Sequence, residues 1–320
     1  MNFARASARL VDQAMCAMMF AIQQRHRLTR HSRRQLEEYI AAHEGLTRGA
    51  YFAAPPVVIE QPLLNAHLSW QSPFNTGFRA NDRVRVDLFP CDHDWARPTV
   101  IFLHALMSTS DLGYRRWAAR FNEHGWNACF MHLPFHYSRR PHGRLNGELA
   151  ITSDLVRTAE GLRQGVSEVR QLLGVLRGWG CREFGLMGLS YGGWIGGLLA
   201  SVEPDFRWIG LLEPIVDVDH AIWEAPTGLA LRRELRRVGV EAELIARHFP
   251  LESPMHGVPH GTADRVIFCA GEYDKIARIE DVQRLQERWQ GSEMLRLPQG
   301  HFGYGMMRTV WNRLQQKGWI

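Results

Sequence analysis

Residues 184–193 read Phe184-Gly185-Leu186-Met187-Gly188-Leu189-Ser190-Tyr191-Gly192-Gly193. An apolar segment typical of a strand leads into the pattern Gly-x-Ser-x-Gly, and residues 192–202 continue as a helix. Glycines on both sides of the serine let the strand and the helix approach closely, and the helix N-terminus brings its positive end to the serine. The stretch therefore predicts a nucleophile elbow that carries Ser190. The alternative is a glycine-rich turn whose serine only caps the helix.

A serine hydroxyl is a weak nucleophile until a base takes its proton, and histidine is the usual base because its pKa lies near neutrality. The chain has 15 histidines, so the candidate base must be identified by its place relative to the expected strands. His301 follows the last expected strand in the run Gly300-His301-Phe302-Gly303. His256 and His260 come before the penultimate strand and are expected in a lid or linker. We therefore predict His301 as the base for Ser190.

The imidazole needs a carboxylate that fixes its tautomer and stabilises its cation. Asp274 lies just past the expected strand 266–270, and the chain order Ser190, Asp274, His301 suits a nucleophile elbow. Two rivals stay open. Glu272 is two residues away, and Glu213 ends the preceding strand as the alternative acid.

The tetrahedral intermediate of acyl transfer needs two donors for its oxyanion. The backbone N–H of Tyr191, directly after the nucleophile, is one candidate. The second is expected from the loop after strand 99–103, where Ala105 or Leu106 can donate. The side chain of His104 is expected to brace this loop.

Strands and helices alternate from residue 57 onward, which predicts a parallel sheet with helices on both faces. The segment 99–103 is almost wholly apolar, as in the buried centre of such a sheet. Residues 217–258 interrupt the rhythm, are helical and arginine-rich, and are interpreted as an inserted lid. The remaining strands are expected at 67–70, 83–89, 128–132, 184–187, 208–212, 266–270 and 294–297. The helices are expected at 111–124, 153–176 with Ser153 as its cap, 192–202, 279–289 and 304–317.

The first 55 residues differ from the rest and predict an N-terminal helical extension, with helices before residue 23 and at about 30–43. The first helix has an apolar face. We expect the pair to pack on the main domain or on a second copy of the chain. The alternatives are a basic amphipathic helix on a membrane surface and, less favoured, a transit peptide. The apolar face is expected to be formed by Phe3, Leu10, Val11, Ala14, Met15, Met18, Met19 and Ile22.

The composition excludes several classes of protein. Of 320 residues, 45% are hydrophobic and 22% are charged, and the longest apolar run, residues 14–22, is too short to span a bilayer. Five scattered cysteines without a CxxC pattern favour a reducing compartment, so we expect a cytoplasmic protein, with peripheral membrane contact as an alternative. The net charge of +5 comes without a nucleic-acid motif, so no nucleic-acid partner is expected.

Two arginines follow the fourth expected strand, near the rim of the candidate site. Arg139 and Arg140 are candidates to hold a carboxylate or phosphate of the substrate. The alternative is that both form ion pairs with the lid or the surface. The spacing of His132, His136 and His142 fits no standard metal site, so no metal and no cofactor are expected.

These motifs together resemble the α/β-hydrolase superfamily over residues 56–320. The matching pieces are His104-Ala105, Gly188 to Gly192, Gly271 to Asp274 and Gly300-His301. The resemblance implies an eight-stranded, mostly parallel sheet and a Ser190–Asp274–His301 triad. The stretch 133–141 resembles a loop of a little-characterised bacterial branch. Where the family often has glycines, this chain has Ala105-Leu106-Met107, which leaves the shape of that loop open.

The leading functional hypothesis is a serine hydrolase, esterase-like, that cleaves a small-molecule carboxylic ester through an acyl-enzyme without a cofactor. An acyltransferase or a thioesterase on the same triad is the first alternative. The second alternative is a non-catalytic protein of this fold that binds a membrane or a partner, with the N-terminal helix as the contact to the membrane or to a second copy.

Overall fold

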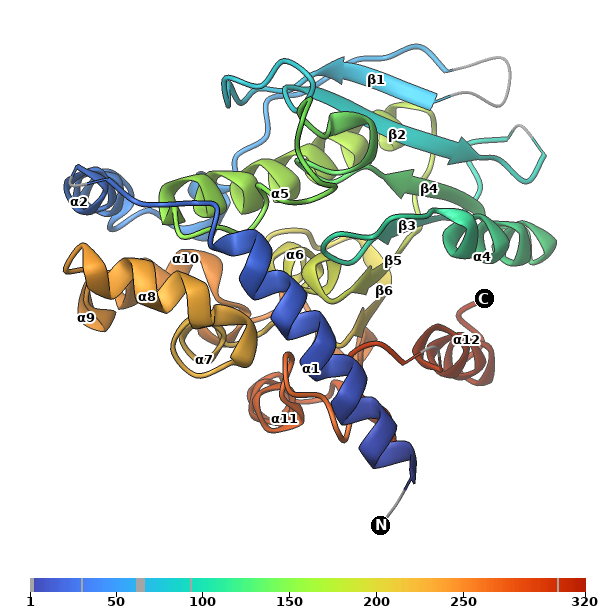
Figure 1. Ribbon diagram of the computed structural model, residues 1–320. Coiled ribbons are helices and arrows are strands. Elements are labelled where there is room, and N and C mark those ends of the chain that lie inside the picture. Colours follow the sequence, from blue (N-terminus) through green and yellow to red (C-terminus); the bar gives the residue numbers. More distant parts are fainter. Residues whose placement is uncertain (1–2, 30, 62–66, 93, 304) are drawn as a thin grey trace.

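The structure is a computed structural model that describes residues 3–29, 31–61, 67–92, 94–303 and 305–320, without the side chains of residues 3–5. One sheet organises the chain (Figure 1). Its eight strands are β1 His67–Gln71, β2 Arg83–Phe89, β3 Thr99–Leu103, β4 Asn127–Met131, β5 Phe184–Leu189, β6 Phe206–Leu212, β7 Val266–Gly271 and β8 Glu293–Leu297.

The strand order across the sheet is β1-β2-β4-β3-β5-β6-β7-β8. β2 pairs antiparallel with β1 and with β4, and all the other neighbours pair parallel. The predicted eight-stranded, mostly parallel sheet is thus confirmed. β3 and β5 lie at its centre, and every residue of β3 is buried, as its apolar sequence indicated.

Helices cover both faces of the sheet because successive side chains of a strand point to opposite sides. In β3, Val100 and Phe102 belong to the core under α4 and α12, whereas Ile101 and Leu103 belong to the core under α5, α6 and α11. Figure 1 shows these two groups of helices on opposite sides of the strands. The helices are α4 Leu112–Glu123, α5 Leu155–Gly178, α6 Tyr191–Ala200, α11 Ile279–Arg288 and α12 Met306–Gln316.

Two further groups of helices lie outside this alternation. The insertion between β6 and β7 holds α7 Val218–Trp223, α8 Leu229–Arg237, α9 Ala242–Ala246 and α10 Phe249–Glu252. The N-terminal part holds α1 Phe3–Gln23, α2 Ser32–His43 and α3 Arg48–Tyr51. α1 contacts α8, and α2 contacts α5, so both pack on the rest of the chain. Among the described helices, none combines the length and the hydrophobicity that a membrane span requires.

Some predicted boundaries were wrong. Asp154, not Ser153, caps α5: its side chain accepts a hydrogen bond of 3.2 Å from the backbone N–H of Arg157. β6 starts at Phe206, two residues earlier than expected, because Phe206 pairs with Phe184 across an irregular register. Arg30 and Tyr304, the expected first residues of two helices, lie outside the described residues.

Candidate active site

Ser190 sits at the turn between β5 and α6 with φ +51° and ψ −107°, a strained conformation for a residue with a side chain. Two glycines make the turn sterically feasible. A Cβ on Gly188 would lie 2.5 Å from the carbonyl oxygen of Gly192, and a Cβ on Gly192 would collide with the carbonyl oxygen of Leu103. The turn at Ser190 thus packs closely between the end of β3 and the start of α6.

A continuous chain of hydrogen bonds joins three buried side chains from distant parts of the sequence. Ser190 Oγ lies 2.8 Å from Nε2 of His301, and Nδ1 of His301 lies 2.7 Å from Oδ2 of Asp274. Oδ1 of Asp274 accepts the backbone N–H groups of Ile276 at 2.7 Å and Ala277 at 2.9 Å. An ionised carboxylate only accepts, so Nδ1 of His301 carries a proton and Nε2 can receive the proton of Ser190.

The electrostatics of the site favour a positive charge on His301. Burial alone would lower the pKa of His301, but the carboxylate of Asp274, supported by Glu213 and Asp12, outweighs this effect and raises the pKa to about 9. An imidazolium that forms during a reaction is therefore stabilised where it forms.

The two rival acids take different positions. Glu272 is exposed. Glu213 is buried, its backbone has φ +46°, and its Oε1 accepts from Nε2 of Gln299 at 3.1 Å. Burial raises the pKa of Glu213 well above its usual range. The structure thus brings Asp274 against His301, whereas Glu213 accepts from Gln299.

Glu213, Asp274 and His301 each offer one metal-ligating atom, and these atoms lie within 4.8 Å of one another. However, Nδ1 of His301 and Oδ2 of Asp274 already form a direct hydrogen bond of 2.7 Å. A cation at this place would have to break that bond, so the geometry suits a shared proton better than a metal.

The candidate oxyanion donors surround Ser190. Tyr191 is the first residue of α6, where helix N–H groups have no partner within the helix. Ala105 and Leu106 line the same cavity as Ser190. The positive φ in this loop, +56°, falls on Met107. The N–H of Met107 donates to Nε2 of His136 at 3.1 Å and is therefore engaged.

Two buried, neutral histidines brace this loop. Nδ1–H of His104 donates to the carbonyl oxygen of Ala105 at 2.9 Å, and its Nε2 accepts the N–H of Leu133 at 3.1 Å. His136 acts in the same way, with Pro134 as acceptor and Met107 as donor. Burial lowers the pKa of His136 to about 4 and that of His104 well below its usual range, so both stay neutral and can accept.

No family model matches the chain. Two uncharacterised proteins of Mycobacterium tuberculosis, from strains CDC 1551 / Oshkosh and H37Rv, are each 30% identical to it over 224 residues. The match covers 68% of this chain, and the chain spans about half (53%) of the length of these relatives.

Solved structures resemble the chain over most of its length. Acetyl xylan esterase 1 from Thermoanaerobacterium sp. JW/SL YS485 is 15% identical with a TM-score of 0.53, over 87% of this chain and 92% of that one. The α/β-hydrolase GrgF from Penicillium sp. sh18 is also 15% identical with a TM-score of 0.53, over 78% and 96%. The chain has the α/β-hydrolase fold. At these identities the similarity concerns the fold alone.

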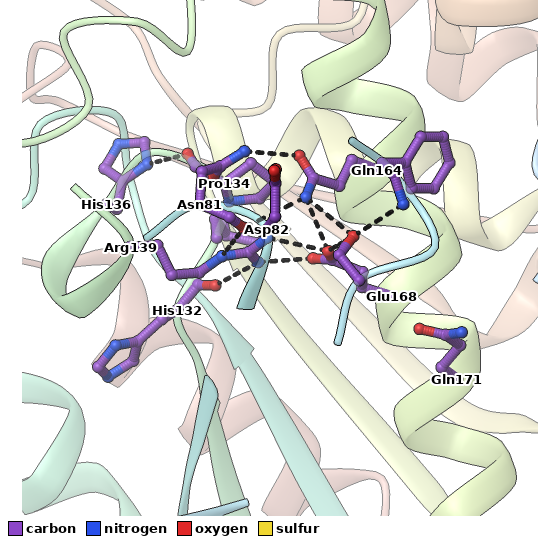
Figure 2. A network of polar contacts seen from close by, with 12 residues as sticks. Asn81, Asp82, His132, Pro134, His136, Arg139, Gln164, Glu168 and Gln171 are labelled. Atoms are coloured by element: carbon purple, nitrogen blue, oxygen red, sulfur yellow. Dashed lines mark hydrogen bonds and ion pairs between the residues drawn. The ribbon is translucent and has the colours of Figure 1, made fainter. Parts of the chain in front are cut away.

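In this α/β-hydrolase fold, Arg139 is not at the substrate rim, and that prediction was wrong. Its side chain is fully buried and forms a two-bond ion pair with Glu168 of α5, at 2.5 and 2.9 Å. It also donates to the carbonyl oxygens of Asn81 and His132 (Figure 2). Glu168 accepts from Ser72 as well. The network fastens the loop after β4, which carries His136, to α5 and the turn before β2.

Arg140, the second rim candidate, is exposed and does not line the cavity beside Ser190. Its role at the rim stays a prediction. The two arginines differ in burial because the 3₁₀ turn Tyr137–Arg139 directs the side chain of Arg139 inward and leaves that of Arg140 exposed.

We expect Arg139→Met to lower the free energy of unfolding by about 3–5 kcal/mol, because the variant leaves the Glu168 carboxylate buried without its cation. Chemical denaturation measures this loss. Arg140→Ala is the matched control and should change stability by less than about 0.5 kcal/mol. The double variant Arg139→Met/Glu168→Met should regain part of the loss. Wild-type stability of Arg139→Met would contradict the assignment.

A cavity of about 340 Å³ opens beside Ser190 and His301 in this α/β-hydrolase fold. Its walls come from α1, α2, α5 and the helical insertion and are mostly apolar. They include Met15, Met19, Ile40, Leu155, Ile222 and Leu231.

Sequence reasoning missed three contributions to this site. The methionines of α1 form a wall of the cavity, although their helix face was expected to pack on the domain or a second copy, or to contact a membrane surface. His136 holds the loop at Met107. Asp12, the one acidic residue of α1, reaches the backbone of His301. The signal was present for Asp12: an acid three and seven residues before Met15 and Met19 shares their helix face.

Proposed function

We propose that the protein is a serine hydrolase that cleaves carboxylic esters with an apolar acyl part. The observation that carries the proposal is the unbroken hydrogen-bond chain from Ser190 Oγ through His301 to Asp274, at the wall of an apolar cavity. The esterases among proteins of similar fold support the same reaction class.

In the proposed reaction, Ser190 Oγ attacks the ester carbonyl while Nε2 of His301 takes its proton. Asp274 stabilises the imidazolium through Nδ1. The N–H of Tyr191 and one N–H of residues 105–106 receive the oxyanion. His301 then gives its proton to the leaving alcohol, and an acyl-enzyme forms. Water, deprotonated by His301, attacks the acyl-enzyme and releases the carboxylic acid and the free serine.

The cavity wall suggests which part of the ester lies inside. Methionine side chains are unbranched and flexible, and they adapt to apolar groups of different shape. Met15 and Met19 of α1 face the cavity together with aliphatic residues of α5 and α8. The acyl chain is therefore the part that fits this space, and each methylene buried there contributes up to about 0.8 kcal/mol.

A panel of p-nitrophenyl esters tests the proposal. We expect kcat/KM to rise by about ten- to a hundred-fold from the acetate to the octanoate, since added methylenes enter the apolar cavity. Release of p-nitrophenol is the readout, and an added alcohol reports acyl transfer as a second product. The absence of turnover for every ester would contradict the proposed function. Equal kcat/KM for all chain lengths would contradict the acyl assignment.

A further inference from the structure

Helix α1 reaches the catalytic loops, although it lies outside the alternating strands and helices of the fold. Figure 1 shows it crossing the molecule beside the helical insertion, and it contacts α8 and the 3₁₀ turn Pro226–Gly228. Its one acidic residue, Asp12, is almost completely buried, with 1% of its surface exposed. Burying a carboxylate costs free energy unless hydrogen bonds or charges compensate for it, so the contacts of Asp12 must supply this compensation.

The Asp12 carboxylate binds the backbone of two loops at once. Its Oδ1 and Oδ2 lie 3.2 and 3.4 Å from the N–H of His301, and Oδ2 lies 3.4 Å from the N–H of Lys275. Lys275 directly follows Asp274. The carboxylate therefore connects the loop that carries the candidate base with the loop that carries the candidate acid.

The residue before His301 is adapted to this contact. A Cβ on Gly300 would lie 2.9 and 3.0 Å from the two Asp12 oxygens and 3.1 Å from Cβ of Ala8. A side chain at this position would force the Asp12 carboxylate or α1 to shift away from the loop. Glycine at this position thus permits a close approach between α1 and the catalytic histidine loop.

Resting on the proposed function, we propose that Asp12 is a positioning residue for His301: from α1 it fastens the loops of the base and the acid, so that the triad is complete only with α1 docked. A shift of about 1 Å in such a group costs on the order of a hundred-fold in rate. The N-terminal helix is then a part of the active site that supplies both this anchor and the methionine wall of the cavity.

The charge of Asp12 supports this role. The acidic groups around His301 are Asp274, Glu213 and Asp12, and Cys16 lies one turn from Asp12 on α1. Burial and the nearby Asp274 raise the pKa of Asp12, while its hydrogen bond from His301 lowers it. In its ionised form Asp12 favours the imidazolium, so removal of this charge lowers the pKa of His301.

Two substitutions separate positioning from folding. Asp12→Ala removes both acceptors, and we expect kcat for p-nitrophenyl acetate to fall about ten- to a hundred-fold, with KM changed much less. Asp12→Asn keeps one acceptor oxygen and loses the charge. It should regain most of kcat and shift the acid limb of kcat/KM to lower pH. Gln13→Ala, an exposed neighbour on α1, is the control and should behave as the wild type.

Wild-type kcat and an unshifted pH limb in folded Asp12→Ala and Asp12→Asn would overturn the inference. So would losses that follow only the folded fraction, measured by circular dichroism. If Asp12→Ala does not fold, the pH limb of Asp12→Asn decides alone. Failure of the proposed function is distinguishable, because then the wild type itself would not turn over the ester.

Discussion

Ser190→Ala is expected to lower kcat for the preferred ester by about a thousand-fold or more, because the variant has no nucleophile and only the oxyanion donors and the cavity remain. Loss of the serine should cost little stability. Its backbone N–H still donates to the carbonyl oxygen of Leu212 at 2.8 Å, and alanine is no larger than serine. Steady-state turnover of the ester panel measures the effect.

The control for this substitution is the melting temperature, which should stay within a few degrees of the wild type. If the melting temperature is unchanged, the loss of kcat results from the missing nucleophile and not from unfolding. Comparable turnover by folded Ser190→Ala and wild type would remove Ser190 from the mechanism.

Asp274→Asn is expected to lower kcat by about ten thousand-fold, because an amide can donate to Nδ1 of His301 and stabilise the wrong tautomer. The pH dependence should change as well. His301 must be neutral to accept a proton, so wild-type kcat/KM falls as the pH drops through about 9. Without the Asp274 charge the pKa of His301 is lower, and the remaining activity should hold to lower pH.

Glu272→Gln, which changes an exposed carboxylate two residues away, is the matched control and should keep wild-type kinetics. Glu213→Gln should have a much smaller effect than Asp274→Asn, because Asp274 forms the hydrogen bond to Nδ1 of His301 and Glu213 accepts from Gln299. A larger loss of kcat in Glu213→Gln than in Asp274→Asn would make Glu213 the acid and contradict the assignment of Asp274.

The sheet was predictable because its central strands carry a strong local signal. The residues of β3, β5 and β7 are nearly all apolar, and only a strand covered on both faces buries such a run. The ends of elements depend on contacts that local sequence does not contain. β6, for example, is extended by a pairing between Phe206 and Phe184 across an irregular register.

The same distinction applies to the site. Residues 188–192 carry a steric requirement within a few positions, so the elbow could be found by its pattern. The burial of Arg139 could not be predicted from a local pattern, because its partner Glu168 lies 29 positions away on α5. An arginine after a sheet strand suits either a substrate anion or a buried partner, and only the packing of α5 distinguishes the two cases.

The N-terminal helix shows how an amphipathic pattern leaves its partner undefined. Its apolar face suits a membrane, a second copy or the domain itself, and the structure turns Met15 and Met19 toward the cavity. Leu10 and Val11, on the outer side, stay exposed. Contact of this outer side with a membrane or a second copy stays a prediction.

The most direct test of the account is labelling with a fluorophosphonate, which reacts with an activated serine and forms a stable adduct. We expect the intact wild-type protein to gain one adduct, mapped to Ser190 by mass spectrometry of its peptides. Labelling should be lost in Ser190→Ala and slowed in Asp274→Asn. A folded wild-type protein that acquires no adduct on Ser190, at reagent concentrations that label a known serine esterase, would contradict the account.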